Sequence, residues 1–441
     1  MIQEKTASFL SSRHSKLVTR GLLFLVLFLV GTARLSPTYN AGAKFPLHPE
    51  AIHLARSLAF HHQFADPFRL ASTGPSAYLS PAFPAFLALL IRLFGTGPQA
   101  DFAFRFAAAA ATAAQLALLP LLTEFVGLRL GAGLLAWFMG ILPPILTFPE
   151  WEMAYAGLLA VIATILFWVV LTHPKARFGW SASLGAISGL LLLTSASALP
   201  VLLAWFGYSI WKFRTRVFHS GRWAAMVVLV LVLIPWTVRN YLVFHRWIPL
   251  RSALGLALEA SNNDCALAGV RQSEASGCFF LHSPNHNPAE ADRARTLGES
   301  EYNAMKLRDT IAWITNHPRR FAVLTAQRFY AFWFPNEGES LREEFTRRAR
   351  RRERLAIYLA TILSVPGLLA ILKAKREVGG ILASWLVFFP PIYYIALFED
   401  RYRYPILWVT FVCAGYSLAY FATAVVRRLI AQPISCCVGS S

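Results

Sequence analysis

The stretch IPWTVRNYLVFHRWIPLRSALGLALEASNND, residues 234–264, marks the change from apolar to polar sequence around which the chain is organised. A hydrophobic run over residues 223–236 is cut by Pro235, and cationic and polar side chains follow at once: Arg239, Asn240, His245, Arg246 and Arg251. A charge at the bilayer centre costs about 2.5–3.5 kcal/mol, so such a cluster beside Trp and Tyr belongs at the headgroup level. The stretch therefore predicts a membrane exit, with membrane core before it and an extramembrane or interfacial module after it.

The composition is that of an integral membrane protein. Of 441 residues, 56% are hydrophobic and only 15% are charged, whereas a soluble domain carries nearer a quarter charged residues. The formal net charge is +19, but the Lys and Arg residues lie mostly between apolar runs rather than on one amphipathic face. This arrangement argues against nucleic acid and indicates anionic lipid and phosphate as partners.

The apolar runs predict about ten transmembrane helices with interfacial helices between them. Residues 21–33 follow a basic segment as in a secretory signal, but the many later runs favour an uncleaved first span. The long run 184–211 is broken by polar residues and Pro200, so two short helices are expected there. The short run 82–94 and the Arg-containing run 320–334 are expected at the interface. The other expected spans are residues 102–122, 131–146, 153–171, 224–236, 355–372, 379–397 and 406–426.

This assignment places most basic loops on the side of the N-terminus, which the positive-inside rule makes the cytoplasm. We therefore expect both termini in the cytoplasm. Residues 342–354 are an exception, because this basic segment falls on the outer side. The predicted organisation is a transmembrane core over 1–238 with an outer first loop at 36–101, a periplasmic or interfacial module over 239–354, and C-terminal helices over 355–441.

Two helices are expected outside the membrane. Residues 48–64 interleave polar and apolar side chains as in an amphipathic helix lying on the bilayer. Residues 289–316 have apolar residues near helical spacing, and His317-Pro318 ends that helix. In the same module, Cys265 and Cys278 could form one disulfide or remain two free thiols. No CxxC and no Cys/His metal spacing is present, so no zinc site is expected.

Polar residues gather on the predicted outer face, and each has a structural alternative. Glu50 could act as a general base towards an acceptor hydroxyl, or only form the polar face of a surface helix. Glu152 could belong to a site, or only favour the start of a helix through the dipole. Arginine suits phosphate, so Arg239, Arg251, Arg401 and Arg403 could bind a phosphate, although interfacial snorkelling explains single arginines equally well. The run Glu399-Asp400-Arg401-Tyr402-Arg403 is denser than snorkelling requires.

These segments, in this order, resemble bacterial GT-C glycosyltransferases, in the style of the family-39-like, protein-mannosyltransferase and aminoarabinose-transferase group. The resemblance extends from about residue 48 to residue 405. It rests on the acidic first loop and on the phrases TGPSAYLSPAFPAFLALLIRLFG (73–95), WE (151–152), PWTVRNYLVF (235–244), LRSALGLALEASNN (250–263), GESEY (298–302), NHPRRF (316–321) and RYRYP (401–405).

The resemblance implies an all-α polytopic membrane protein with a GT-C-like bundle. It also implies a polyprenyl-phosphate-linked sugar as donor, a cell-envelope acceptor, transfer on the periplasmic side and inversion at the anomeric carbon. By position, Glu50 and Glu152 would be catalytic. The substrate-binding residues would be Arg239, Arg251, Arg401, Tyr402, Arg403 and Asn263. No cofactor is expected with certainty, and a divalent metal ion stays an open alternative.

Other functional classes are less well supported. No P-loop, dinucleotide fingerprint, GxSxG elbow or HExxH occurs, so ATP-driven transport and serine or zinc hydrolysis have no support. A transporter or flippase for a lipid carrier would place polar residues through the helix midplanes, whereas here they gather at one face. A catalytically degenerate scaffold of the same fold is the remaining alternative.

Overall fold

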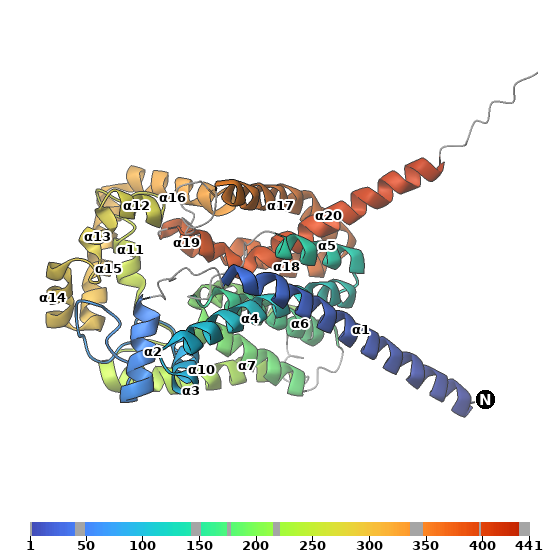
Figure 1. Ribbon diagram of the computed structural model, residues 1–441, viewed down its shortest axis with the longest axis horizontal. Coiled ribbons are helices and arrows are strands. Elements are labelled where there is room, and N and C mark those ends of the chain that lie inside the picture. Colours follow the sequence, from blue (N-terminus) through green and yellow to red (C-terminus); the bar gives the residue numbers. More distant parts are fainter. Residues whose placement is uncertain are drawn as a thin grey trace, which may run out of the picture.

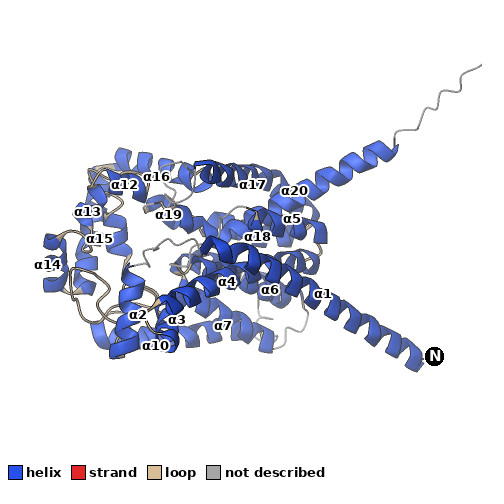
Figure 2. Cartoon of the chain, in the orientation of Figure 1, coloured by secondary structure: helices blue, strands red, loops and turns tan. Residues whose placement is uncertain are grey.

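The computed structural model describes residues 2–39, 49–142, 151–173, 178–214, 221–335, 347–396 and 398–431. Within these residues the regular elements are helices joined by loops and turns, and β pairing is limited to two isolated bridges (Figure 2). Seven segments are long and apolar enough to cross a bilayer. They lie in α1 (Ile2–Tyr39), α4 (Pro98–Phe125), α6 (Met153–Thr172), α10 (Ala224–Phe244), α17 (Arg347–Ala374), α18 (Arg376–Phe388) with α19 (Pro391–Ile395), and η3 (Asp400–Arg403) with α20 (Tyr404–Ala431). The protein is therefore an all-α polytopic membrane protein.

Shorter apolar helices complete the bundle. They are α3 (Ala82–Phe94), α5 (Leu130–Ile141), α7 (Phe178–Thr194) and α8 (Leu199–Phe213). The last three have 12, 17 and 15 residues, fewer than a straight crossing needs. The ten expected spans correspond to the seven long segments together with these three. The expected break between α7 and α8 is confirmed, because Ser195 is extended and residues 196–198 form a short 3-10 helix.

A continuous apolar core holds the bundle together. α20 packs against α17, α5 and α6, while α4 packs against α1, α5 and α6. The largest buried side chains include Trp385 of α18, Trp408 of α20 and Phe167 of α6. Aromatic side chains bury large apolar areas, so these contacts fix the central helices that carry the polar segments at one end of the bundle.

The cationic loops gather at one end of the bundle. Arg20 of α1 pairs with Glu124 at the end of α4 at 2.7 Å, Lys212 of α8 pairs with Glu377 of α18, and Arg129 donates to Thr423 near the end of α20. Figure 1 shows the first turns of α1 at the opposite end from α11–α15. The basic loops thus lie together, as the sequence predicted, and their assignment to the cytoplasm stays a prediction.

The polar module consists of short helices. They are α11 (Leu254–Glu259), α12 (Val270–Ala275), α13 (Cys278–His282), α14 (Pro288–Leu297), α15 (Glu299–Asn316) and α16 (Pro318–Trp333). At Gly255 of α11 an added Cβ would lie 1.9 Å from the Asn303 carbonyl oxygen of α15. Glycine is therefore required for the close contact between α11 and α15. With 16 residues, α16 is shorter than the candidate spans, and its interfacial position stays a prediction.

The structure confirms one predicted helix outside the membrane core and corrects two predicted helix boundaries. The amphipathic helix over residues 48–64 is confirmed as α2 (Pro49–His61). The helix expected over 289–316 is two helices, because Gly298 with φ 74° ends α14 before α15 begins. Pro235 does not end its helix: α10 continues to Phe244, and Asn240 in this last part donates to the Ile248 carbonyl at 2.8 Å.

Candidate functional site

Glu50 is held by a side chain of the polar module. It lies in the first turn of α2, where the helix dipole favours a carboxylate. Asn285, in the loop between α13 and α14, donates from Nδ2 to Glu50 Oε1 at 2.7 Å and accepts the Arg69 backbone N–H at 2.9 Å. Asn285 is buried. The amide therefore orients the predicted catalytic carboxylate and links the first loop to the module.

Tyr78 lies within the electrostatic influence of both Glu50 and Arg251. Burial raises the pKa of the Tyr78 hydroxyl, the charge of Glu50 raises it further, and the charge of Arg251 opposes both. The hydroxyl therefore stays protonated at neutral pH and can donate a hydrogen bond. Arg251 is half-buried and forms no hydrogen bond or ion pair with any residue that the structure describes. The phenol of Tyr78 is thus influenced by a carboxylate and by an uncommitted guanidinium of opposite charge.

The polar run before α20 forms a compact buried cluster. Arg401 pairs with Glu399 at 2.5 Å, and its guanidinium lies over the Trp151 ring. Arg403 donates to Asp400 at 2.9 Å and to the Phe332 carbonyl at 3.1 Å. Both arginines are buried, and their charges are compensated by these neighbouring carboxylates. Stabilising the loop is thus one role that the structure gives them.

Tyr402 and Glu152 join this cluster to Arg251. The Tyr402 ring stacks on Tyr393 at 4.5 Å and its hydroxyl accepts from Arg401 at 3.3 Å. Arg251 acts electrostatically on Tyr402, and Glu152 acts on Arg401. Glu152 is at the N-cap position of α6 and makes no capping hydrogen bond. The helix dipole still favours a carboxylate there, so the site role and the structural role of Glu152 both stay open. Glu150 lies outside the described residues.

Two predicted substrate-binding residues are engaged with the chain itself. The Arg239 guanidinium donates to the Ser76 carbonyl at 2.6 Å, to the Phe64 carbonyl at 2.9 Å and to Asn240 Oδ1 at 2.9 Å. Asn263 is buried, donates to the Glu259 carbonyl at 2.9 Å and accepts the Cys265 backbone N–H at 3.1 Å. Neither contact set includes Glu50 or Arg251, so a substrate-binding role for these two residues stays a prediction.

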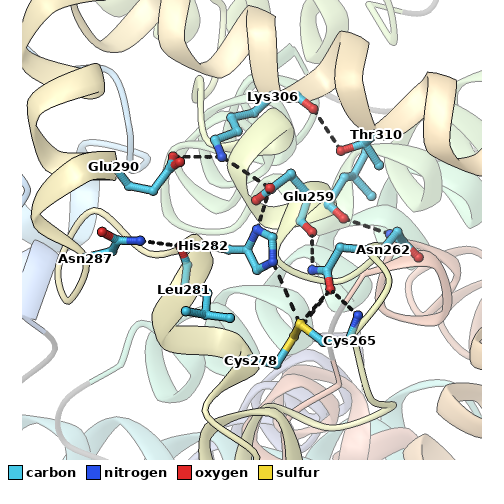
Figure 3. A network of polar contacts seen from close by, with 12 residues as sticks. Glu259, Asn262, Cys265, Cys278, Leu281, His282, Asn287, Glu290, Lys306 and Thr310 are labelled. Carbon is cyan, nitrogen blue, oxygen red and sulfur yellow. Dashed lines mark hydrogen bonds and ion pairs between the residues drawn. A yellow bond between two sulfur atoms is a disulfide. The ribbon is translucent and has the colours of Figure 1, made fainter.

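The module is stabilised by the disulfide Cys265–Cys278 and by a buried charge network next to it (Figure 3). Of the two alternatives left by the sequence, the structure contains the disulfide. Lys306 is 3% exposed and lies 3.2 Å from Glu259 Oε1 and 2.7 Å from Glu290 Oε2. His282 Nδ1 lies 2.6 Å from the same Glu259 oxygen. Burial raises the pKa of Glu290, but hydrogen bonds from Lys306 and Tyr302 outweigh it and hold the pKa below its usual range.

One group of described residues contains side chains of the types that bind metal ions. Ligand atoms of Cys265, Cys278 and His282 lie within 4.8 Å of one another. Zinc binds cysteine as the thiolate, and neither sulfur is a thiolate while the disulfide is intact. In the state that the structure shows, this group therefore supplies one imidazole nitrogen rather than three metal ligands.

Solved structures resemble the chain, whereas no family model and no curated protein matches it. The apo oligosaccharyltransferase of Archaeoglobus fulgidus matches with a TM-score of 0.56 and 13% identity, over 93% of this chain and 51% of that one. The oligosaccharyltransferase AglB of the same organism, in complex with an inhibitory peptide and a dolichol-phosphate, matches at 0.50 and 14%, over 95% and 52%. An Archaeoglobus fulgidus complex with Zn and sulfate matches at 0.53 and 15%, over 93% and 51%.

The chain spans about half the length of these solved structures, and the likeness concerns the fold. It covers the long apolar helices and the module alike, because more than nine-tenths of this chain is matched. The chain therefore shares its fold with these oligosaccharyltransferases, in agreement with the all-α polytopic bundle that the sequence predicted.

Proposed function

We propose that the chain is an inverting glycosyltransferase of a bacterial inner membrane. It moves a sugar from a polyprenyl-phosphate-linked donor to a cell-envelope acceptor on the periplasmic side. The observation that carries this proposal is Glu50, which Asn285 orients at 2.7 Å and whose charge acts on Tyr78 together with that of the uncommitted Arg251 guanidinium. A base and a phosphate-binding cation are the two groups that such a transfer needs. The fold supports the proposal, since AglB binds dolichol-phosphate.

In the proposed mechanism Glu50 takes the proton of the acceptor hydroxyl. The hydroxyl oxygen then attacks C1 of the sugar from the face opposite the phosphate, which inverts the anomeric carbon. The bond between C1 and the phosphate oxygen breaks, and the carrier leaves as a phosphate with one additional negative charge. Arg251 stabilises that charge as it develops, and the protonated Tyr78 hydroxyl is available as a second donor.

The remaining residues of the site support these two. Asn285 keeps a Glu50 oxygen directed into the site, and the buried pair Arg401–Glu399 fixes the loop that bears Tyr402. Glu152 adds negative charge near Arg401. No group of three carboxylate or histidine ligand atoms gathers around Glu50 or Glu152 in the described part of the chain. The proposed mechanism therefore assigns no step to a metal ion.

Glu50→Gln tests the proposal. The amide keeps an oxygen that can accept from Asn285 but cannot take a proton at neutral pH, so transfer is expected to fall at least about 100-fold. The assay supplies purified protein with the lipid-linked sugar fraction and the acceptor fraction of the host membranes and measures sugar transferred. Glu301→Gln is the matched control, because Glu301 pairs with Arg246 and Arg308 on the exposed surface. Full transfer by Glu50→Gln would remove Glu50 from the mechanism.

A further inference from the structure

Four segments that the sequence analysis singled out meet at one buried point. Glu299, of GESEY, accepts the Ala77 backbone N–H at 2.8 Å and the Ser252 hydroxyl at 2.7 Å, both on Oε1. Ala77 belongs to TGPSAYLSP and Ser252 to LRSALG. The Ser252 backbone N–H donates to the Ala77 carbonyl at 2.8 Å. Arg239, of PWTVRN, donates to the carbonyl of the preceding Ser76 at 2.6 Å.

This clamp, formed by Glu299, Ser252 and Arg239 around residues 76–77, has a buried centre and two half-buried members, Ser252 and Arg239. Ser76 and Ala77 have no exposed surface and Glu299 is 2% exposed. Burial raises the pKa of Glu299, while its hydrogen bonds to the loop and the charge of Arg239 lower it. Burying a carboxylate is costly unless hydrogen bonds compensate, and here the compensating donors come from two segments of the candidate site.

The clamp holds the chain neighbours of two residues of the site. Tyr78 follows Ala77 in the chain, and Arg251 precedes Ser252. Glu299 Oε1 therefore joins Ala77, which precedes Tyr78, to Ser252, which follows Arg251. The module reaches this point through the first turn of α15, whose packing against α11 is fixed at Gly255.

We propose that Glu299 is a positioning residue that holds Tyr78 and Arg251 at a fixed separation for the leaving phosphate. The inference rests on the proposed function and extends it, because it assigns a role to a residue that contacts neither substrate. Without the Glu299 carboxylate, the hydrogen bond from the Ser252 backbone N–H to the Ala77 carbonyl is the one described link left between the segment at 76–78 and the segment at 251–252, so their separation is less firmly fixed. Misplacement of a catalytic group by 1 Å costs on the order of 100-fold in rate.

The test compares Glu299→Ala with Glu299→Gln. Alanine removes the shared acceptor, so kcat is expected to fall on the order of 100-fold, with a smaller change in KM. Glutamine retains an acceptor oxygen and is expected to restore most of the rate. Glu301→Ala, two residues away in the same helix and exposed, is the control and is expected to transfer sugar at the wild-type rate. Ser252→Ala, which removes one hydrogen bond only, gives an intermediate loss and serves if Glu299→Ala does not fold.

A double-variant measurement separates positioning from general destabilisation. If Glu299 acts through Arg251, adding Glu299→Ala to Arg251→Ala changes kcat by no more than about twofold, the usual error of additivity. The positioning role would be overturned if the kcat losses of Glu299→Ala and Arg251→Ala multiplied in full in the double variant. A Glu299→Ala enzyme with wild-type kcat would overturn it too. Wild-type protein that neither binds undecaprenyl phosphate nor transfers sugar would instead refute the proposed function, and the positioning role with it.

Discussion

Arg251→Ala separates phosphate binding from folding more cleanly than any other arginine substitution in the site. The Arg251 guanidinium has no hydrogen bond or ion pair among the described residues, so its removal leaves no buried acid uncompensated. The change in unfolding free energy is therefore expected to stay within about 0.5 kcal/mol. A hydrogen bond to a charged group contributes about 1.5–3 kcal/mol, which corresponds to roughly a 10- to 150-fold weaker affinity for the carrier phosphate.

The assay titrates undecaprenyl phosphate into detergent-solubilised protein and follows tryptophan fluorescence, with thermal unfolding measured on the same samples. Arg251→Lys keeps the charge without the planar fork and is expected to fall between wild type and alanine. Arg295→Ala, an exposed module arginine paired with Asp292, is the control. Unchanged affinity in Arg251→Ala would refute the reasoning, because an uncommitted cation at the site would then make no contact with the phosphate.

Three further predictions concern stability. Lys306→Met removes the buried ammonium shared by Glu259 and Glu290, which keep only His282 and Arg293 as charged partners. It is expected to cost at most about 3–5 kcal/mol near neutral pH, read as a lower midpoint of thermal unfolding. The pKa of Glu290 is held below its ordinary 4.5, so the stability that ionised Glu290 contributes is present above that value and is lost as pH falls. The difference in unfolding midpoint between wild type and Lys306→Met should therefore shrink below about pH 4.5. A difference that stays constant with pH would contradict this. Arg403→Met leaves the buried Asp400 without its cationic partner and should likewise lower the free energy of unfolding by about 3–5 kcal/mol. A wild-type midpoint of thermal unfolding in this variant would show that the pair is dispensable. Cys265→Ser removes the disulfide across a short loop and should lower the free energy of unfolding by about 3 kcal/mol. If dithiothreitol lowers the unfolding midpoint of the variant as much as that of wild type, loss of the disulfide does not explain the lower stability.

Much of the fold was predictable because membrane helices have a strong local signature. Long apolar runs gave α4, α6 and α20 directly, and polar residues gave the break between α7 and α8. Two boundaries were wrong for reasons that depend on context. Pro235 removes only one helical hydrogen bond, and tertiary contacts of the turns that follow it keep α10 intact. Gly298 ends α14 through a left-handed backbone that periodicity does not reveal.

The site was predictable only in part, because its geometry comes from contacts between distant segments. Glu50 and Arg251 could be proposed from the charge pattern and the resemblance. Asn285 could not, since its bond to Glu50 joins residues 235 positions apart. Glu299 stood within a quoted phrase, but nothing local distinguishes it from the exposed Glu301 two residues later. Burial of one face of α15 separates the two, and burial depends on the folded module.

The most direct test of the proposed function is a balance of products. Purified protein in vesicles is given a polyprenyl-phosphate-linked sugar and an acceptor fraction, and free polyprenyl phosphate and transferred sugar are both quantified by mass spectrometry. The account predicts that the two appear in equal amounts, that neither forms without acceptor, and that Glu50→Gln abolishes both. Intact lipid-linked sugar moved between leaflets, with no release of carrier phosphate, would contradict it and identify a lipid transporter instead.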